Sequence, residues 1–150
     1  MIRHIWSVLC SKASIDRETN NVSLFEVFES LQFATNAEVQ FPVNLPFTAT
    51  VVSLWVRQEP NTPVAGQMRI SLQSPAGEEL ISHGLAINLQ DTSRTRTLIS
   101  LNGIRIAGNG THLFEISWRI RDDNEWFPVA LLPLDITVRI DPGLGQERAE

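Results

Sequence analysis

The stretch Thr-His-Leu-Phe-Glu-Ile-Ser-Trp-Arg-Ile-Arg, residues 111–121, alternates apolar and polar side chains along its whole length. The residues of the apolar phase are His112, Phe114, Ile116, Trp118 and Ile120. Polar residues occupy the other phase, and only Leu113 interrupts them. Successive side chains of a β-strand point to opposite faces, so this period of two gathers the apolar residues on one side. The stretch therefore predicts an antiparallel strand with one face on a core and the other in water.

The same alternation recurs on both sides of this stretch. Residues 67–73 and 134–140 repeat it clearly, and residues 80–89 and 95–101 also carry apolar residues in phase. Residues 5–10 and 47–57 are apolar in both phases. Apolar side chains on both faces indicate a central strand or an outer face that something else covers.

Turn-forming residues separate these segments, as they must if the strands fold back on one another. They lie at residues 16–21, 61–63, 74–77, 107–110 and 122–125. The spacing predicts an all-β fold of about eight strands, built as an antiparallel two-sheet sandwich of Greek-key, immunoglobulin-like type.

Two segments need separate interpretation. Pro42 and Pro46 mark the second half of a long connection, residues 34–47, which we predict to be a crossover or an edge because proline cannot donate to a sheet ladder. Residues 22–33 fit either a strand or one helical face by periodicity alone. Their aromatic and β-branched content, directly after a turn, favours the strand.

Length and composition indicate one domain over residues 1–141, followed by a flexible tail, residues 142–150. The single cysteine, Cys10, excludes an internal disulfide, and its phase predicts a small buried side chain. The apolar N-terminal run is too short for a signal peptide, and no stretch of about 18 apolar residues is present. We expect a cytoplasmic protein.

The formal net charge of −5 disfavours two classes of partner. Nucleic-acid affinity depends on positive charge that neutralises phosphates, so DNA or RNA is not expected. The chain also lacks a cluster of basic residues, so an anionic membrane surface is not expected either.

The sequence carries no catalytic, phosphate-binding or dinucleotide-binding motif, and we predict no cofactor and no metal. His83 and His112 both fall in apolar phases, where an acid-base role competes with a buried imidazole bonded to a backbone carbonyl. The buried interpretation is the better one. Acidic turn residues such as 122–125 fit solvated turns better than calcium ligands because the Asp-x-Asp spacing is absent.

Five residues are candidates for contact with a ligand or partner. Trp126 and Phe127 follow the acidic turn, where an exposed aromatic pair could stack on a sugar. Arg105, Arg119 and Arg121 lie on or near the polar face of one predicted hairpin and could attract an acidic partner. Core packing of the tryptophans and a solvated charged face are the competing interpretations. The phases of Trp6 and Trp118 point inward, which favours core packing for these two.

Two motifs carry resemblances. Residues 110–116, Gly-Thr-His-Leu-Phe-Glu-Ile, are similar to the Gly-x-Tyr-x-Phe-x-Val opening of a late strand in many β-sandwiches, with His112 at the tyrosine position. Residues 4–10 and 15–27, with the proline-framed segment 41–47, resemble a family of small uncharacterised bacterial proteins. The resemblance implies a compact β-sandwich and transfers no catalytic residues.

These observations lead to three functional hypotheses. The first is a non-enzymatic module that acts by protein–protein contact, as a homo-oligomer or an accessory subunit, because one apolar face of residues 47–57 needs covering. The second is a small-molecule or carbohydrate-binding module that uses Trp126 and Phe127. The third, and weakest, is an enzyme built on His83 or His112.

Overall fold

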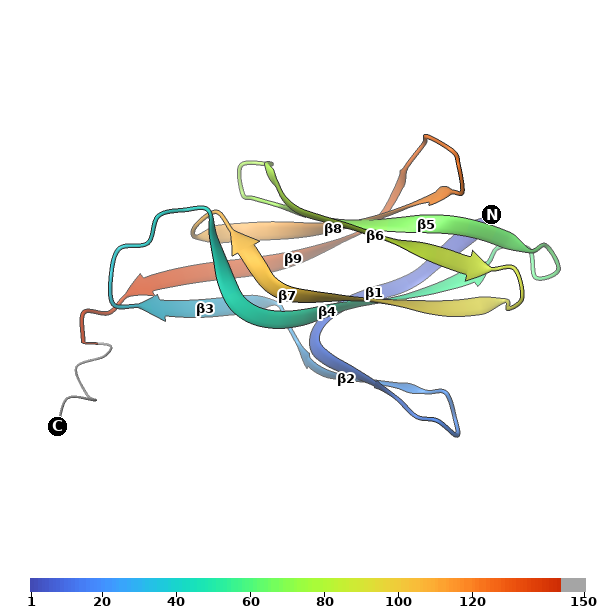
Figure 1. Cartoon of the computed structure of the whole chain (residues 1–150), viewed down its shortest axis with the longest axis horizontal. Helices are drawn as coiled ribbons and strands as arrows, with labels where there is room; N and C mark the ends of the chain where they lie inside the picture. The colour runs from blue at the N-terminus through green and yellow to red at the C-terminus, as the bar shows by residue number, and fades with distance from the viewer. Residues whose placement is uncertain (144–150) are drawn as a thin grey trace.

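The computed structural model describes residues 1–143, and these residues form nine strands (Figure 1). The strands are β1 (Ile2–Ile15), β2 (Val22–Val27), β3 (Ser30–Thr35), β4 (Val43–Arg57), β5 (Val64–Gln73), β6 (Glu79–Leu89), β7 (Arg94–Ile106), β8 (Gly110–Ile120) and β9 (Phe127–Ile140). None of these residues forms a helix that could cross a bilayer. The predicted tail lies almost wholly outside the described residues.

The strands form two sheets that pack face to face. One sheet has the order β2-β1-β4-β7, and the other has the order β3-β9-β8-β5-β6. All pairs are antiparallel except β3 and β9, which run parallel. The all-β, two-sheet prediction is confirmed, but neither the count of eight strands nor the Greek-key, immunoglobulin-like order is.

The extra strand arises from residues 22–33, which form two strands rather than one. The strand interpretation is confirmed, but the strand is interrupted at Phe28 and Glu29, where the chain crosses from one sheet to the other. The Phe28 amide donates to the Leu9 carbonyl, and the Phe28 ring packs edge-on to Phe47 at 4.8 Å. Phe28 therefore anchors the chain at the crossing point.

The core lies between the sheets and follows the predicted phases of β8 and β5. His112, Phe114 and Ile116 are fully buried, and Trp118 is 5% exposed. Met68, Ile70 and Leu72 of β5 are also fully buried. In β9 the alternation holds through Val138, but Ile140 at the strand end is exposed.

The predicted inward phase of Trp6 is wrong because both phases of β1 are apolar, and the phase of Leu9 is the one that faces the core. Trp6 pairs with Leu54 on the outer face of the four-stranded sheet, as Val8 does with Val52. Cys10 is buried as predicted, although it too lies on that outer face. Burial raises the pKa of its thiol.

The proline-framed segment, residues 41–47, leads into an edge of the four-stranded sheet, as its prolines predict. β4 begins at Val43 and pairs there with β7 alone, since its pairing with β1 reaches only Thr50. A bulge between Leu45 and Thr48 accommodates Pro46. The first part of β4 is thus an edge, and the connection before it is shorter than predicted.

The end of β1, the following turn and β2 form a hairpin that stands out from the sandwich (Figure 1). We call residues 11–27 the arm. At its tip, one guanidinium nitrogen of Arg96 on β7 donates to the carbonyl and side-chain oxygens of Asn20, at 2.7 and 2.8 Å. The arm is therefore tied to the outer face of the four-stranded sheet.

Candidate functional site

The outer face of the five-stranded sheet is polar along its central strands. On β5 it carries Gln67 and Arg69, and on β8 it carries Ser117 and Arg119. Gln67 lies opposite Arg119, and Arg69 opposite Ser117. The two arginines are therefore diagonal neighbours on adjacent strands.

Trp126 joins these arginines from the connection between β8 and β9. The guanidinium carbon of Arg69 lies 4.3 Å from the centre of its ring, and that of Arg119 lies 4.5 Å away. Both distances are within the range of cation–π attraction. Arg119 also donates from Nε to Oε1 of Gln67 at 2.8 Å. We call Arg69, Arg119 and Trp126 the arginine–tryptophan cluster.

The acids on the same face form no salt bridge with these arginines within residues 1–143. Glu115 accepts a hydrogen bond from Ser117 at 3.3 Å, and Glu79 accepts one from Ser71 at 2.8 Å. Within residues 1–143, no carboxylate oxygen lies within 4.0 Å of either guanidinium of the cluster. The cluster is thus a local concentration of positive charge on a protein of net negative charge.

A hollow of about 310 Å³ lies beside the cluster. Its lining includes Gln67 and the cluster itself, together with Ser82, Gly84 and Ala86 of the edge strand β6. Gly84 lies directly opposite Arg69, so no side chain fills the space next to that guanidinium.

The five predicted contact residues separate into different places. Trp126 and Arg119 come together, and they meet Arg69, which the sequence analysis missed. Phe127 instead packs on Trp118 with ring centres 5.1 Å apart. Arg121 is exposed just beyond the end of β8, outside the contacts of the cluster.

Arg105 lies apart from the other arginines because β7 and β8 do not form a hairpin. They belong to different sheets, which corrects the expectation of one shared polar face. The only signal for Arg69 was its polar phase in residues 67–73, and the pattern within one strand cannot show which residues of other strands lie next to it.

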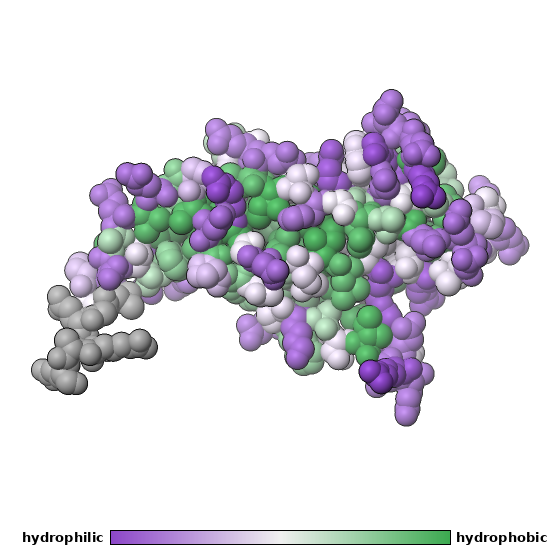
Figure 2. All heavy atoms as spheres, viewed as in Figure 1, coloured by the Kyte–Doolittle hydropathy of each residue, from purple (hydrophilic) through white to green (hydrophobic). Residues whose placement is uncertain are grey.

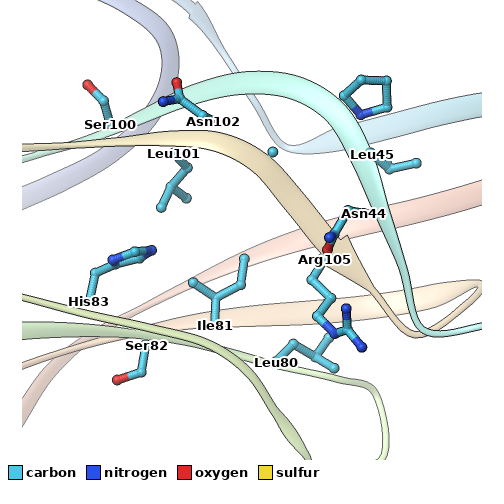
Figure 3. Close-up of a pocket in the computed structure, with 12 residues that line it drawn as sticks. Asn44, Leu45, Leu80, Ile81, Ser82, His83, Ser100, Leu101, Asn102 and Arg105 are labelled. Carbon is cyan, nitrogen blue, oxygen red and sulfur yellow. The ribbon is translucent and has the colours of Figure 1, made fainter.

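Arg105 contributes to a second hollow, a cleft of about 740 Å³ between β6 and β7. Figure 3 shows Ile81, His83 and Leu101 pointing into the space between the two strands, with Arg105 beside Leu80 at the other end. His83 is exposed there, so the prediction that it is buried is wrong. It sits on an edge strand, where the inward phase still reaches solvent.

His112 is a buried imidazole bonded to the backbone, as predicted. Its ring is fully buried, Nδ1 lies 3.2 Å from the carbonyl oxygen of Gly110, and Nε2 accepts from the Ala107 amide at 3.1 Å. These partners require the neutral ring with its proton on Nδ1. Burial lowers its pKa. The imidazole therefore ties the start of β8 to the preceding loop.

Asp16, one of the acidic turn residues, stabilises its own turn. Asp16 accepts backbone hydrogen bonds from Glu18 and Thr19 at 2.8 and 2.9 Å, and these bonds lower its pKa, that from Thr19 most. Across residues 1–143, no group of three or more histidine, cysteine or acidic side chains is placed to hold a metal ion.

The outer face of the four-stranded sheet carries a group of apolar residues among polar ones such as Arg96. Register with β4 places on it the residues Trp6, Val8, Phe25, Val27, Val52, Leu54 and Leu98, which we call the apolar face. Val27 is 57% exposed, Phe25 48% and Leu98 37%. Figure 2 shows hydrophobic surface between the polar tip of the arm and the sandwich.

Together these features define a two-sheet β-sandwich with the arginine–tryptophan cluster on one outer face and the apolar face on the other. No protein-family model and no curated protein sequence matches the chain. Among solved structures, it is similar to the crystal structure of the C-terminal domain of wzt, with a TM-score of 0.55 and 11% sequence identity. The match covers 91% of this chain and 73% of the other. At this identity the likeness shows the fold alone.

Proposed function

We propose that the protein is a non-enzymatic interaction module of the cytoplasm, which binds another protein or a second copy of itself through the arm and the apolar face. The observation that carries this proposal is the exposure of Val27, Phe25 and Leu98 on one sheet face. A sandwich normally presents alternating polar residues to water on its outer faces. Apolar side chains that remain exposed together on such a face mark an interaction site.

The arm supports the same proposal for a separate reason. An isolated two-stranded hairpin is at best marginally stable in water. The arm exposes apolar side chains on both sides, since Phe25 lies on one side and Ile15, which is 44% exposed, lies on the other. A bound protein would remove both sides from water and stabilise the hairpin.

The test introduces a charge into the apolar face and the same charge elsewhere. Val27→Asp alters the apolar face, and Leu131→Asp is the matched control, because Val27 and Leu131 are both 57% exposed and Leu131 lies on the outer face of the other sheet. Sedimentation at micromolar concentration measures self-association, and affinity capture with each variant as bait measures binding to another protein.

We expect wild type and Leu131→Asp to behave alike, and Val27→Asp to bind at least about tenfold more weakly, because a buried unpaired carboxylate is costly. A strictly monomeric wild type that captures no partner contradicts the proposal. So does an equal loss of binding in both variants. Circular dichroism of each variant verifies that the fold is intact.

A second candidate function is favoured by a different feature, the hollow beside Trp126. Aromatic and polar side chains around a concave surface are typical of small-molecule and carbohydrate sites. If the protein is such a module, Trp126→Ala should abolish binding in a glycan screen. An intact protein that binds no glycan in that screen would count against this candidate.

A further inference from the structure

We infer that the arginine–tryptophan cluster binds a small ligand that carries a carboxylate or phosphate on a sugar ring. This inference rests on the second candidate function and goes beyond it by naming the chemistry of the ligand. Three features of Arg69, Arg119 and Trp126 carry it: their charge, their free donors and the hollow beside them.

No carboxylate of residues 1–143 forms a salt bridge with the cluster. Both guanidinium carbons lie within 4.5 Å of the same ring centre, so they are less than twice that distance apart. Two like charges at such a separation repel each other. The indole ring attracts both but carries no net charge. A bound oxyanion in contact with both guanidiniums would offset this repulsion, and within residues 1–143 no carboxylate oxygen lies within 4.0 Å of either one. Glu115, a diagonal neighbour of Arg69 across β5 and β8, makes no such contact.

The cluster also keeps hydrogen-bond donors free. Stacking on an indole uses the flat face of a guanidinium and leaves its N–H edge available. In the described part of the chain, Arg119 donates only from Nε, to Gln67, and the guanidinium of Arg69 makes no hydrogen bond. Arg57 shows the contrast, because its guanidinium donates to three backbone carbonyls and is structural. A guanidinium edge matches the two oxygens of a carboxylate or phosphate.

The hollow gives the rest of the ligand a place to bind. Its volume of about 310 Å³ lies at the small end of ligand pockets, which suits one or two sugar rings. Gly84 forms part of it, and a Cβ at that position would lie 3.5 Å from the Met68 carbonyl oxygen, an ordinary contact. Packing therefore does not require glycine here, but a side chain would narrow the hollow next to Arg69.

The experiment titrates the full chain with glucuronate, glucose 6-phosphate and neutral glucose at low ionic strength. Binding is followed by calorimetry and by the NMR signals of the indole N–H groups, with Trp126→Phe assigning the one that moves. We expect one or both acidic sugars to bind at least about tenfold more tightly than glucose, and their affinity to fall as salt increases. Comparison of the two acidic sugars distinguishes a carboxylate from a phosphate ligand.

Four variants locate the binding. Arg69→Gln and Arg119→Gln should each weaken acidic-sugar binding at least about tenfold, whereas Arg121→Gln, which removes the same charge outside the cluster, should leave it unchanged. Arg69→Lys keeps the charge but loses the planar edge. It should retain the fold and still bind more weakly than wild type, which a merely structural stack on Trp126 would not predict.

The outcomes separate the inference from the function on which it rests. If glucose binds as tightly as the acidic sugars, the inference is overturned while the second candidate function stands. If none of the three sugars binds, the inference is overturned and the hollow loses its support as a sugar site. Equal weakening by Arg121→Gln and Arg69→Gln would mean that only overall charge matters, which also overturns it.

Discussion

Trp118 fills the core where β8 packs between β5 and β9, and it is 5% exposed. Replacing it with alanine empties a large buried site, so Trp118→Ala should lower the free energy of unfolding by about 3–5 kcal/mol. Arg121→Ala, on an exposed side chain close by, should change it by less than about 0.5 kcal/mol. Urea denaturation of both variants measures this. Similar small effects would show that the phase of β8 is assigned wrongly.

His112 makes stability depend on pH. Burial holds its pKa in the folded protein below the ordinary value of 6.5, so the unfolded chain binds the proton more readily. Its contribution is complete above pH 6.5 and is lost as the pH falls through the folded-state pKa. Unfolding free energies at about pH 8 and about pH 5 should therefore differ more for wild type than for His112→Gln. The burial of His4 also lowers its pKa, but His4 is present in both proteins, so its effect cancels. An equal pH dependence in the two would contradict this role.

Single residues were predictable where a strand alternates without interruption. The burial of Phe114, Ile116 and Trp118 follows directly from their phase. The orientation of Trp6 was not predictable, because both phases of residues 5–10 are apolar and alternation alone cannot show which of them faces the core. Only part of the arginine–tryptophan cluster was predictable. Arg119 and Trp126 are near in sequence, but Arg69 meets them only through the register of β5 with β8.

At the scale of elements, two glycines in the five-stranded sheet make a sharp test of strand packing. A Cβ on Gly66 of β5 would lie 2.5 Å from Cδ1 of Ile2 and 2.7 Å from the carbonyl oxygen of Arg119. Gly66→Ala should therefore destabilise the protein by about 1–3 kcal/mol. Gly84→Ala on β6 meets only an ordinary contact and should be neutral or stabilising by up to about 1 kcal/mol. Thermal unfolding compares them, and equal effects would contradict the close approach of β1 to β5.

The elements themselves were largely readable from the sequence, and their partners were not. Turns and alternation located most strands, but nothing in residues 22–33 showed that the chain changes sheets at Phe28 or that β3 would pair in parallel with β9. Such pairings depend on contacts between distant segments, which a local pattern does not encode. The expected hairpin of Arg105 and Arg119 failed for this reason.

At the scale of the whole molecule, the sandwich has two unlike outer faces. The five-stranded sheet presents polar residues and the arginine–tryptophan cluster, whereas the four-stranded sheet presents the apolar face and the arm. The sequence indicated this difference through the two apolar phases of residues 47–57. If both proposals hold, one molecule binds a protein on one side and a small ligand on the other.

Hydrogen–deuterium exchange of the protein alone and in its associated form tests the interaction proposal most directly. Amides that a partner covers exchange more slowly, and the method reports on each strand separately. We predict that association slows exchange in the arm, residues 11–27, and in β7, while exchange in β5, β6 and β8 is unchanged. Protection confined to β5, β6 and β8, or no change anywhere, would contradict the account.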